Sequence, residues 1–112
     1  MNSNKLVSLL GLCRKAGKLS MGHDAAVESV RKQLSALVLL TNDASLRHKR
    51  EIAAISETMP VRELELSSAQ LAPFLGKKCC IYSVNDPGFT KAILKLLDEE
   101  EPPYDGIEIQ NS

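Results

Sequence analysis

The hydrophobic positions of this chain follow two different spacings, one typical of helices and one typical of buried strands. In residues 4–16, leucines such as Leu6 and Leu10 recur at intervals of three and four residues, which places them on one face of an α-helix. In residues 36–40 the apolar positions form an unbroken run, which is too short for a typical helix and suits a strand buried on both faces. The chain is therefore expected to combine amphipathic helices with a central, covered strand.

The same two patterns alternate along the rest of the chain, with capping and chain-breaking residues marking the ends of the segments. Helices are predicted, in chain order, at residues 4–16, 23–33, 44–57, 67–75 and 86–97. Strands are predicted at residues 19–21, 36–40, 60–64 and 79–84. The resulting order, α-β-α-β-α-β-α-β-α, predicts an α/β fold in which helices cover both sides of a four-stranded sheet.

Two local features refine these boundaries. Thr41, Asn42 and Asp43 form a cluster of capping residues, which is expected to start the third helix. Pro73 lies inside the fourth predicted helix, where it removes a backbone donor and clashes with the preceding turn. That helix is therefore expected to be short or distorted.

The length of 112 residues fits one domain, expected at residues 1–100 and followed by an acidic, flexible tail at residues 101–112. Hydrophobic residues make up 44% of the chain and charged residues 25%, which are ordinary values for a globular protein. No apolar run approaches the roughly 20 residues that a membrane span requires, and the first residues do not follow the pattern of a signal peptide. A cytoplasmic protein without a membrane partner is the expectation.

The cysteines and histidines are too few and too scattered to predict a metal site. Cys13, Cys79 and Cys80 lack the CxxC spacing of zinc ligands, and only two histidines accompany them. Cys79 and Cys80 are expected in a strand, where their side chains point to opposite faces. All three cysteines are interpreted as free, mostly buried thiols, and a redox role is the alternative.

The sequence offers little for catalysis. Its six glycines never approach the spacing of a phosphate-binding or dinucleotide-binding loop. No nucleophile stands in a recognisable pattern with a base, and the two histidines lack identifiable partners for acid–base chemistry. We therefore expect no catalytic residues, no cofactor and no small-molecule substrate.

Charge is distributed unevenly, although the formal net charge is zero. Residues 1–50 contain nine Lys and Arg against three Asp and Glu, a net charge of +6, and residues 51–112 carry the opposite net charge of −6. An asymmetry of this kind favours a polyanionic partner for the first half. The alternative is that both halves are solvated surface with salt bridges between them.

A candidate anion site lies at Gly22, where the second helix is expected to begin. The first backbone N–H groups of a helix have no partner within it, and together with the helix dipole they favour negative charge. His23 would donate a hydrogen bond to phosphate, and a simply exposed side chain is the alternative. Basic residues on both sides of this position would reinforce it if they share its surface: Arg14, Lys15, Lys18, Arg31 and Lys32. An RNA backbone is the anion that we expect.

Four stretches of the chain resemble the bacterial members of the ribosomal protein L7Ae/L30e/S12e/Gadd45 family, in the same order and with similar spacing. They are residues Leu9–Gly22, Ser35–Ser45, Gly76–Cys80 and Asp86–Ile93. The resemblance extends over roughly residues 4–97 and implies a three-layer α/β/α sandwich with a mixed sheet. It also implies binding to kink-turn RNA, a sharply bent internal loop with tandem sheared G·A pairs.

The resemblance further implies where RNA is held, and the family's motif at the start of the second helix is partly present. Gly22 matches the motif, and Lys18 fits the basic position that many members have before it. Asp24 and Ala25 stand where Asn and either Glu or Gln are typical. Glu28 stands where Lys is typical, so it places a negative charge where a cation would meet phosphate.

A second contact region is implied in the loop before the fourth helix. There, Leu66 would supply an apolar contact to an extruded base, and Ser67 lies beside it. The RNA-binding residues expected from the two regions together are Arg14, Lys15, Lys18, Gly22, His23, Asp24, Arg31, Lys32, Leu66 and Ser67.

The leading hypothesis is a non-catalytic, cytoplasmic protein that binds structured, kink-turn-like RNA and associates with the ribosome. The alternative is a protein-interaction module on the same fold, in which kink-turn binding is weakened or lost. Asp24, Ala25 and Glu28 favour the alternative, because they replace the side chains that the family uses to grip RNA.

Overall fold

The computed structural model describes residues 3–99, which form five helices and four strands. The helices are α1 (Ser3–Lys15), α2 (His23–Arg31), α3 (Leu46–Ile55), α4 (Ser68–Leu75) and α5 (Pro87–Asp98). The strands are β1 (Leu19–Met21), β2 (Leu37–Leu40), β3 (Val61–Glu63) and β4 (Ile81–Val84). The predicted order of elements is confirmed, and the tail expected at residues 101–112 lies outside the described residues.

The four strands form one mixed sheet in the order β1-β4-β2-β3. β4 runs antiparallel to both of its neighbours, β1 and β2, whereas β2 and β3 are parallel. In the central pair, Leu39 lies opposite Tyr82 and Leu37 lies opposite Val84. β2 is thus an interior strand, as its unbroken apolar run predicts.

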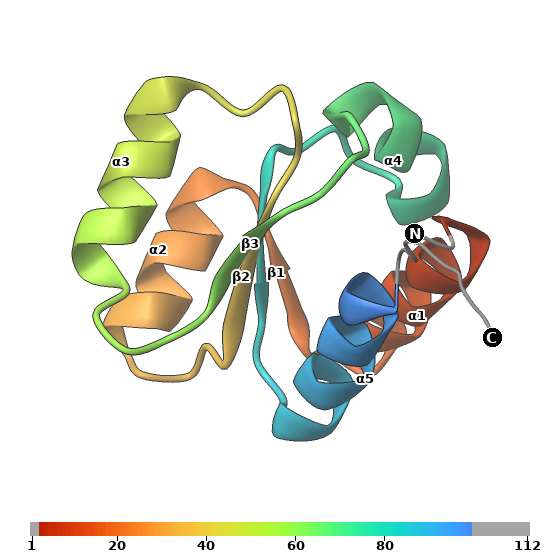
Figure 1. The fold of residues 1–112 in the computed structure, drawn as a ribbon, viewed down its shortest axis with the longest axis horizontal. Coiled ribbons are helices and arrows are strands. Elements are labelled where there is room, and N and C mark those ends of the chain that lie inside the picture. Colours follow the sequence, from red (N-terminus) through yellow and green to blue (C-terminus); the bar gives the residue numbers. More distant parts are fainter. Residues whose placement is uncertain (1–2, 100–112) are drawn as a thin grey trace, which may run out of the picture.

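Helices cover both faces of this sheet, so the fold is the expected three-layer α/β/α sandwich. Figure 1 shows α2 and α3 on one side of the sheet and α1, α4 and α5 on the other. Successive residues of a strand point to opposite faces. Leu37 and Leu39 therefore lie in the core beneath α1, α4 and α5. Val38 and Leu40 lie in the separate core beneath α2 and α3, which explains why no position of β2 is polar.

The start of the fourth strand differs from the prediction. β4 begins at Ile81 rather than at residue 79, because its neighbours β1 and β2 reach only as far as Tyr82 and Ile81 in the pairing. Cys79 and Cys80 precede the strand, yet their side chains enter different layers, with Cys79 in the first core and Cys80 against the second. The prediction of opposite faces is confirmed, and the prediction of the strand boundary is wrong by two residues.

All three cysteines are free thiols, as expected. Cys13 and Cys79 are buried, and Cys80 is half-buried. Burial, and then the nearby charge of Asp86, raise the pKa of Cys13 to about 11. The thiol of Cys13 therefore stays protonated at neutral pH, which supports the structural interpretation over a redox role.

The third helix is capped by Ser45, and not by the cluster Thr41–Asp43 as expected. The backbone N–H of His48 donates to the Ser45 hydroxyl at 3.1 Å. Asp43 is too far ahead of the first turn of α3 to cap it, and its carboxylate accepts hydrogen bonds from Ser68 at the start of α4 instead. The fourth helix has eight residues with Pro73 inside it, which confirms that it is short.

Candidate functional site

The start of α2 and three loops meet at one end of the sheet. β1, β2 and β3 run in one direction and β4 in the other, so the carboxyl ends of three strands share an edge with the amino end of β4. The N–H of Gly22 donates to the carbonyl of Ile81 at 2.8 Å, and the N–H of Asn42 donates to the carbonyl of Leu66 at 3.0 Å. The surface that these bonds hold together is called the loop face below, and it comprises residues 22–24, 41–45, 64–68 and 76–80.

Gly22 lets α2 begin immediately after β1. Its φ of 98° and ψ of 163° fall in a region that is almost exclusive to glycine, because a side chain there meets the flanking peptide groups. The first turn of α2 has no side-chain cap at Gly22, and the first helical bond runs from the Ala26 N–H to the Gly22 carbonyl at 3.0 Å. Among residues 3–99 no side-chain cap takes up the leading N–H groups of α2, an arrangement that suits an anion.

Lys77 brings a positive charge to this helix start from the α4–β4 connection. A methyl group placed on the Cα of Gly22 would lie 3.9 Å from the Lys77 ammonium nitrogen. The guanidinium of Arg14 reaches the neighbouring residue, since a methyl group on Gly76 would lie 3.6 Å from its Nη2 atom. Among residues 3–99, no carboxylate forms an ion pair with Lys77. Within the described part of the chain, the charge of Lys77 is therefore available to a ligand.

Lys77 is absent from the residues that the sequence singled out. It lies far from Gly22 along the chain, and helical or strand periodicity says nothing about a loop lysine. The only signal in the sequence is the stretch Gly76–Cys80, which belongs to the family resemblance but carries no motif of its own. The contact between Lys77 and Gly22 depends on how α4 packs across the sheet.

Four of the five predicted cations do not reach the backbone start of α2, although two of them share a hollow with its first residues. Lys18 precedes β1, so the three residues of that strand, about 10 Å, separate it from Gly22. Arg31 and Lys32 stand about 13 Å along the axis of α2, yet they line one hollow with His23 and Asp24 on the side of that helix. Lys15 lies on α1 and lines a groove beside α4. Among the five cations, Arg14 reaches Gly76 of the loop face, and Arg31 and Lys32 border the hollow beside His23 and Asp24.

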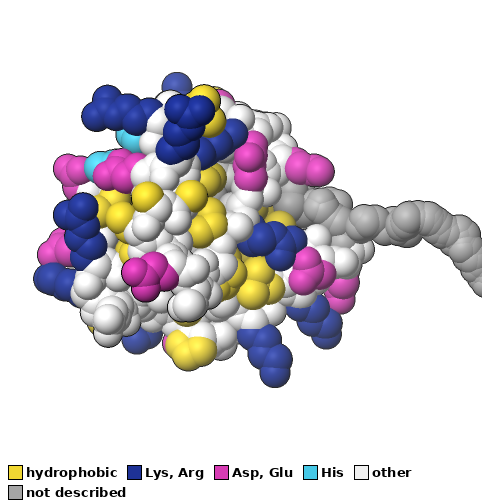
Figure 2. Space-filling model, turned by 60° about the vertical axis from the view of Figure 1, so that its left-hand side comes forward, with side chains coloured by type: hydrophobic (Ala, Val, Ile, Leu, Met, Phe, Trp, Pro, Cys, Tyr) yellow, Lys and Arg dark blue, Asp and Glu magenta, His cyan; other side chains and the backbone are white. Residues whose placement is uncertain are grey.

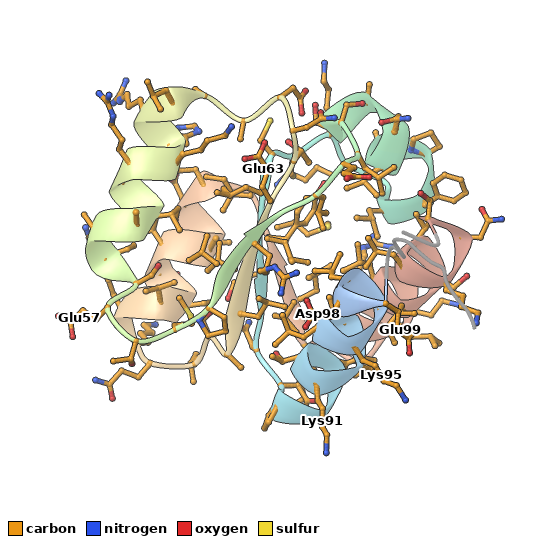
Figure 3. All side chains as sticks on the ribbon, viewed as in Figure 1. Glu57, Glu63, Lys91, Lys95, Asp98 and Glu99 are labelled. Atoms are coloured by element: carbon orange, nitrogen blue, oxygen red, sulfur yellow. The ribbon has the colours of Figure 1, made fainter. Side chains whose placement is uncertain are left out.

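Basic side chains of α3 also lie at this end of the sheet. Figure 2, in which the α2–α3 layer comes forward, shows Lys and Arg side chains gathered along the upper edge, where α2 and α3 begin in Figure 1. The first turns of α3 contribute the basic run Arg47–Arg50. Lys49 of this run donates to Glu63 at 3.2 Å, and Glu63 lies at the end of β3 (Figure 3). The run is therefore partly neutralised within the protein.

His23 is held between two carboxylates. Its Nδ1 lies 2.8 Å from Oδ1 of Asp24 and its Nε2 lies 2.7 Å from Oε1 of Glu51, while its ring stacks on His48 with centroids 4.9 Å apart. The hydrogen bonds to Asp24 and then to Glu51 raise the pKa of His23 above its ordinary value, because both carboxylates stabilise the imidazolium. Both ring nitrogens are thus occupied, and a phosphate must replace a carboxylate to accept from His23.

Glu28 pairs with Lys32 one turn later on α2. The two charged groups lie 2.7 Å apart, and this contact lowers the pKa of Glu28. Both side chains are more than half exposed, so the pair contributes little to stability. Its consequence is electrostatic, because Lys32 offsets the negative charge that Glu28 would present to a polyanion.

Asp43 joins two loops of the loop face. The backbone N–H of Ser68 donates to one carboxylate oxygen of Asp43 at 2.9 Å, and the Ser68 hydroxyl donates to the other at 2.7 Å. The hydroxyl of Thr41, followed by these two bonds from Ser68, holds the pKa of Asp43 well below its ordinary value. The β2–α3 loop is thereby fixed to the first turn of α4.

Leu66 and Ser67 have structural partners that the sequence did not reveal. Leu66 is only 8% exposed and packs into the core beneath α1 and α4, so it offers little surface to an extruded base, contrary to expectation. Ser67 caps α4, since its hydroxyl accepts from the Gln70 N–H at 3.1 Å while the Gln70 side chain accepts from the Ser67 N–H at 2.8 Å. These contacts hold the loop in place, and Glu65 is its exposed side chain.

Replacing Asp43 with alanine is expected to destabilise the protein by about 1–3 kcal/mol at pH 7, because the buried Ser68 loses the acceptor of both its donors. Folding lowers the pKa of Asp43 from its unfolded value of 3.8. The stability that Asp43 contributes is therefore present above pH 3.8 and is lost progressively as the pH falls below that value. Urea unfolding at pH 7 and pH 3 measures both effects, and the difference between wild type and variant should shrink at pH 3.

The matched control is Asp98→Ala, which removes an exposed ion pair with Arg62 at 2.8 Å. It should cost less than about 1 kcal/mol. Equal losses for the two variants, or a loss for Asp43→Ala that does not depend on pH, would contradict the role given to Asp43.

The described residues show no arrangement for metal binding. Nowhere in residues 3–99 do three His, Cys, Asp or Glu side chains lie close enough together to hold an ion. Among the helices of the same residues, none combines the length and the apolar character that crossing a membrane requires.

The amino-acid sequence is similar to that of a known protein family and of two named relatives. The model of the "Ribosomal protein L7Ae/L30e/S12e/Gadd45 family" matches residues 4–94. The chain is 31% identical over 98 residues to "RNA-binding protein YlxQ" of Enterococcus faecium, an alignment that covers 87% of this chain and 95% of that protein. It is 32% identical over 101 residues to the protein of the same name in Bacillus subtilis (strain 168), with 88% and 100% covered.

Two solved structures have a similar fold. A protein of unknown function from Bacillus halodurans C superposes with a TM-score of 0.77 at 30% identity, over 85% of this chain and 98% of that one. The Giardia lamblia 15.5kD RNA binding protein superposes with a TM-score of 0.67 at 14% identity, over 87% of this chain and 85% of that one. The second likeness concerns the fold alone.

Proposed function

Because this chain belongs to the ribosomal protein L7Ae/L30e/S12e/Gadd45 family, we propose that it is a non-catalytic RNA-binding protein that recognises structured, kink-turn-like RNA at its loop face. Two relatives about one-third identical over nearly the whole chain are named RNA-binding proteins, which supports RNA as the ligand. A ribosomal RNA is the proposed source of that structured RNA, and co-sedimentation with ribosomal subunits is the test of this part.

The observation that carries the proposal is the approach of Lys77 to the uncapped start of α2. Backbone N–H groups at a helix start and an unpaired ammonium group both favour a phosphate. Gly22 has no side chain, so a phosphate can come close to the backbone while Lys77 contacts it from the other side. Arg14 adds a second charge behind Lys77.

The acidic groups around this site determine what kind of binding is expected. Asp24 has no amide donor for a base, and its carboxylate is fully exposed beside His23. Glu28 and Glu51 add negative charge along α2 and α3, although Lys32 and His23 offset them. Binding should therefore depend on backbone N–H groups and cations more than on base contacts, and it should be strongly weakened by salt.

The direct test is to titrate the full chain with a kink-turn duplex and with an unkinked duplex of the same length, at about 50 mM and about 200 mM salt. We expect binding to the kinked duplex to be at least about tenfold tighter, which corresponds to about 1.4 kcal/mol. Binding to neither duplex would overturn the kink-turn proposal. Equal and strongly salt-dependent binding to both would leave a non-specific electrostatic role.

Glu28→Lys is expected to strengthen binding to the kink-turn duplex by about tenfold, because a cation replaces the anion that faces the phosphate position of the family motif. Glu99→Lys is the matched control, since Glu99 is exposed at the end of α5, on the other side of the sheet from α2 (Figure 3). Both variants change the net charge equally. The same gain in both would reflect net charge alone, and no gain for Glu28→Lys would show that the phosphate does not pass there.

A protein-interaction module on the same fold is the second candidate. The specific observation in its favour is the acidic character of the first turns of α2, where Asp24 is fully exposed and Glu28 is more than half exposed. The duplex titration separates the two candidates, because an interaction module would bind neither RNA at either salt concentration.

A further inference from the structure

α1 presents an exposed ridge with a groove on each side. Asn4, Ser8 and Leu12 follow one another at intervals of four residues and form the wall shared by the two grooves. One groove, of about 600 Å³, lies between this ridge and α5. The other, of about 870 Å³, lies between the ridge and α4. Both are on the α1–α4–α5 layer, across the sheet from α2 and α3.

The floor and walls of these grooves are apolar at several points. Leu12 is 58% exposed at the ridge and Phe74 is 63% exposed on α4. Leu9 and Leu96 are half-buried and line the groove beside α5. Single exposed leucines are ordinary on a protein surface, but an exposed leucine and an exposed phenylalanine lining one groove form a patch that is able to bury a partner.

The charged residues that line the grooves are mainly basic. Lys5, Lys15 and Lys95 line them, and Glu99 is the only acidic residue among the described residues that do so. Figure 3 shows Lys95 and Glu99 on the side of α5 where α1 lies, whereas Asp98 of the same helix pairs with Arg62 on β3. An occupant of these grooves should therefore combine apolar side chains with negative charge.

We propose that the occupant is residues 100–112 of the same chain. The chain enters this segment directly after Glu99, which itself lines the groove beside α5. The segment contains four acidic residues and no Lys or Arg, and its apolar side chains are Tyr104, Ile107 and Ile109. Its composition thus complements the apolar walls and the lysines that line the grooves.

The length of the segment is sufficient. Thirteen extended residues span up to about 43 Å, whereas the thirteen-residue helix α1 is about 20 Å long. The segment can therefore leave α5, cross the ridge near Leu12 and reach Phe74 without strain. The groove beside α5 lies on the opposite layer from α2, whereas Leu66 of the loop face borders the groove beside α4.

The test uses the full chain with isotopically labelled methyl groups in nuclear magnetic resonance. We expect nuclear Overhauser contacts from the methyl groups of Ile107 or Ile109 to Leu12 and to the ring of Phe74. Leu12→Gln should abolish the contacts to the ring of Phe74, which this substitution leaves in place as a reporter. Leu34→Gln should preserve them, because Leu34 is also 58% exposed but lies in the α2–β2 connection, away from the grooves.

A second pair of variants tests whether the positive charge of the groove contributes to docking. Lys95→Glu should weaken the contacts, while Lys91→Glu, on the same helix but outside the grooves, should leave them unchanged. Absence of the contacts in the wild-type chain, or their persistence in Leu12→Gln, would overturn the proposal. Contacts that appear only between labelled and unlabelled molecules in a mixed sample would also overturn it, since the occupant would then be a second copy.

Discussion

Replacing Lys77 with glutamate should weaken binding of a kink-turn duplex by about 10- to 100-fold at low salt. The ammonium group of Lys77 lies against the uncapped start of α2, and no carboxylate in the described part of the chain neutralises it. A charged hydrogen bond of this kind contributes about 1.5–3 kcal/mol, which corresponds to the stated loss in affinity. Titration of labelled duplex by fluorescence anisotropy measures it.

Lys91→Glu is the control for Lys77→Glu. Lys91 is also exposed, and it lies on α5 on the other side of the sheet (Figure 3). Both substitutions lower the net charge by two, so only the local contact differs. The slope of log affinity against log salt concentration should become shallower in Lys77→Glu and stay the same in Lys91→Glu. Similar losses in the two variants would show that RNA responds to net charge and does not bind at Gly22.

Leu10→Ala should destabilise the fold by about 2–5 kcal/mol. The Leu10 side chain is fully buried in the core that α1 shares with α4, α5 and the sheet. Its truncation leaves a cavity in a close-packed region and loses the transfer free energy of the removed groups. Alanine is the best helix former, so the loss reports packing and not a change in helix propensity. Equilibrium unfolding in urea measures the free energy directly.

Leu46→Ala is the control for this core substitution. Leu46 is the first residue of α3 and is 61% exposed, so the same truncation there should change stability by no more than about 0.5 kcal/mol. A small effect of Leu10→Ala would mean that α1 is loosely attached. The grooves on its outer face would then be a consequence of mobility and not a fixed docking surface.

The element order was predictable because local patterns decide it. The apolar run of β2 reflects its two covered faces, and Pro73 accounts for the shortness of α4. The Asp86–Pro87 pair marks the start of α5, where the Asp86 carboxylate accepts from the Phe89 N–H at 2.8 Å. Each of these signals involves residues within a few positions of one another. Such local interactions do not depend on how distant parts of the chain pack.

The composition of the site was less predictable. Gly22 was identifiable as a helix start, and its unusual backbone angles agree with that assignment. Arg31 and Lys32 stand about 13 Å from Gly22 along α2, since each helical residue advances the chain by about 1.5 Å, and they meet its first turn only along the hollow that His23 and Asp24 line. The family resemblance implied a contact from Leu66 to an extruded base, yet the Leu66 side chain is buried in the core. Nearness in the sequence is a poor guide to nearness at the site.

By itself, the sequence determined where helices and strands form, the glycine that opens α2 and the uneven distribution of charge. The tertiary structure alone decided which charges reach that helix start. Lys77 arrives from the α4–β4 connection, His23 is held by Glu51 of α3, and Asp43 fixes Ser68 of α4. The reason is physical: local propensities act within about one helical turn, whereas these contacts join residues that only the packing of helices on the sheet brings together.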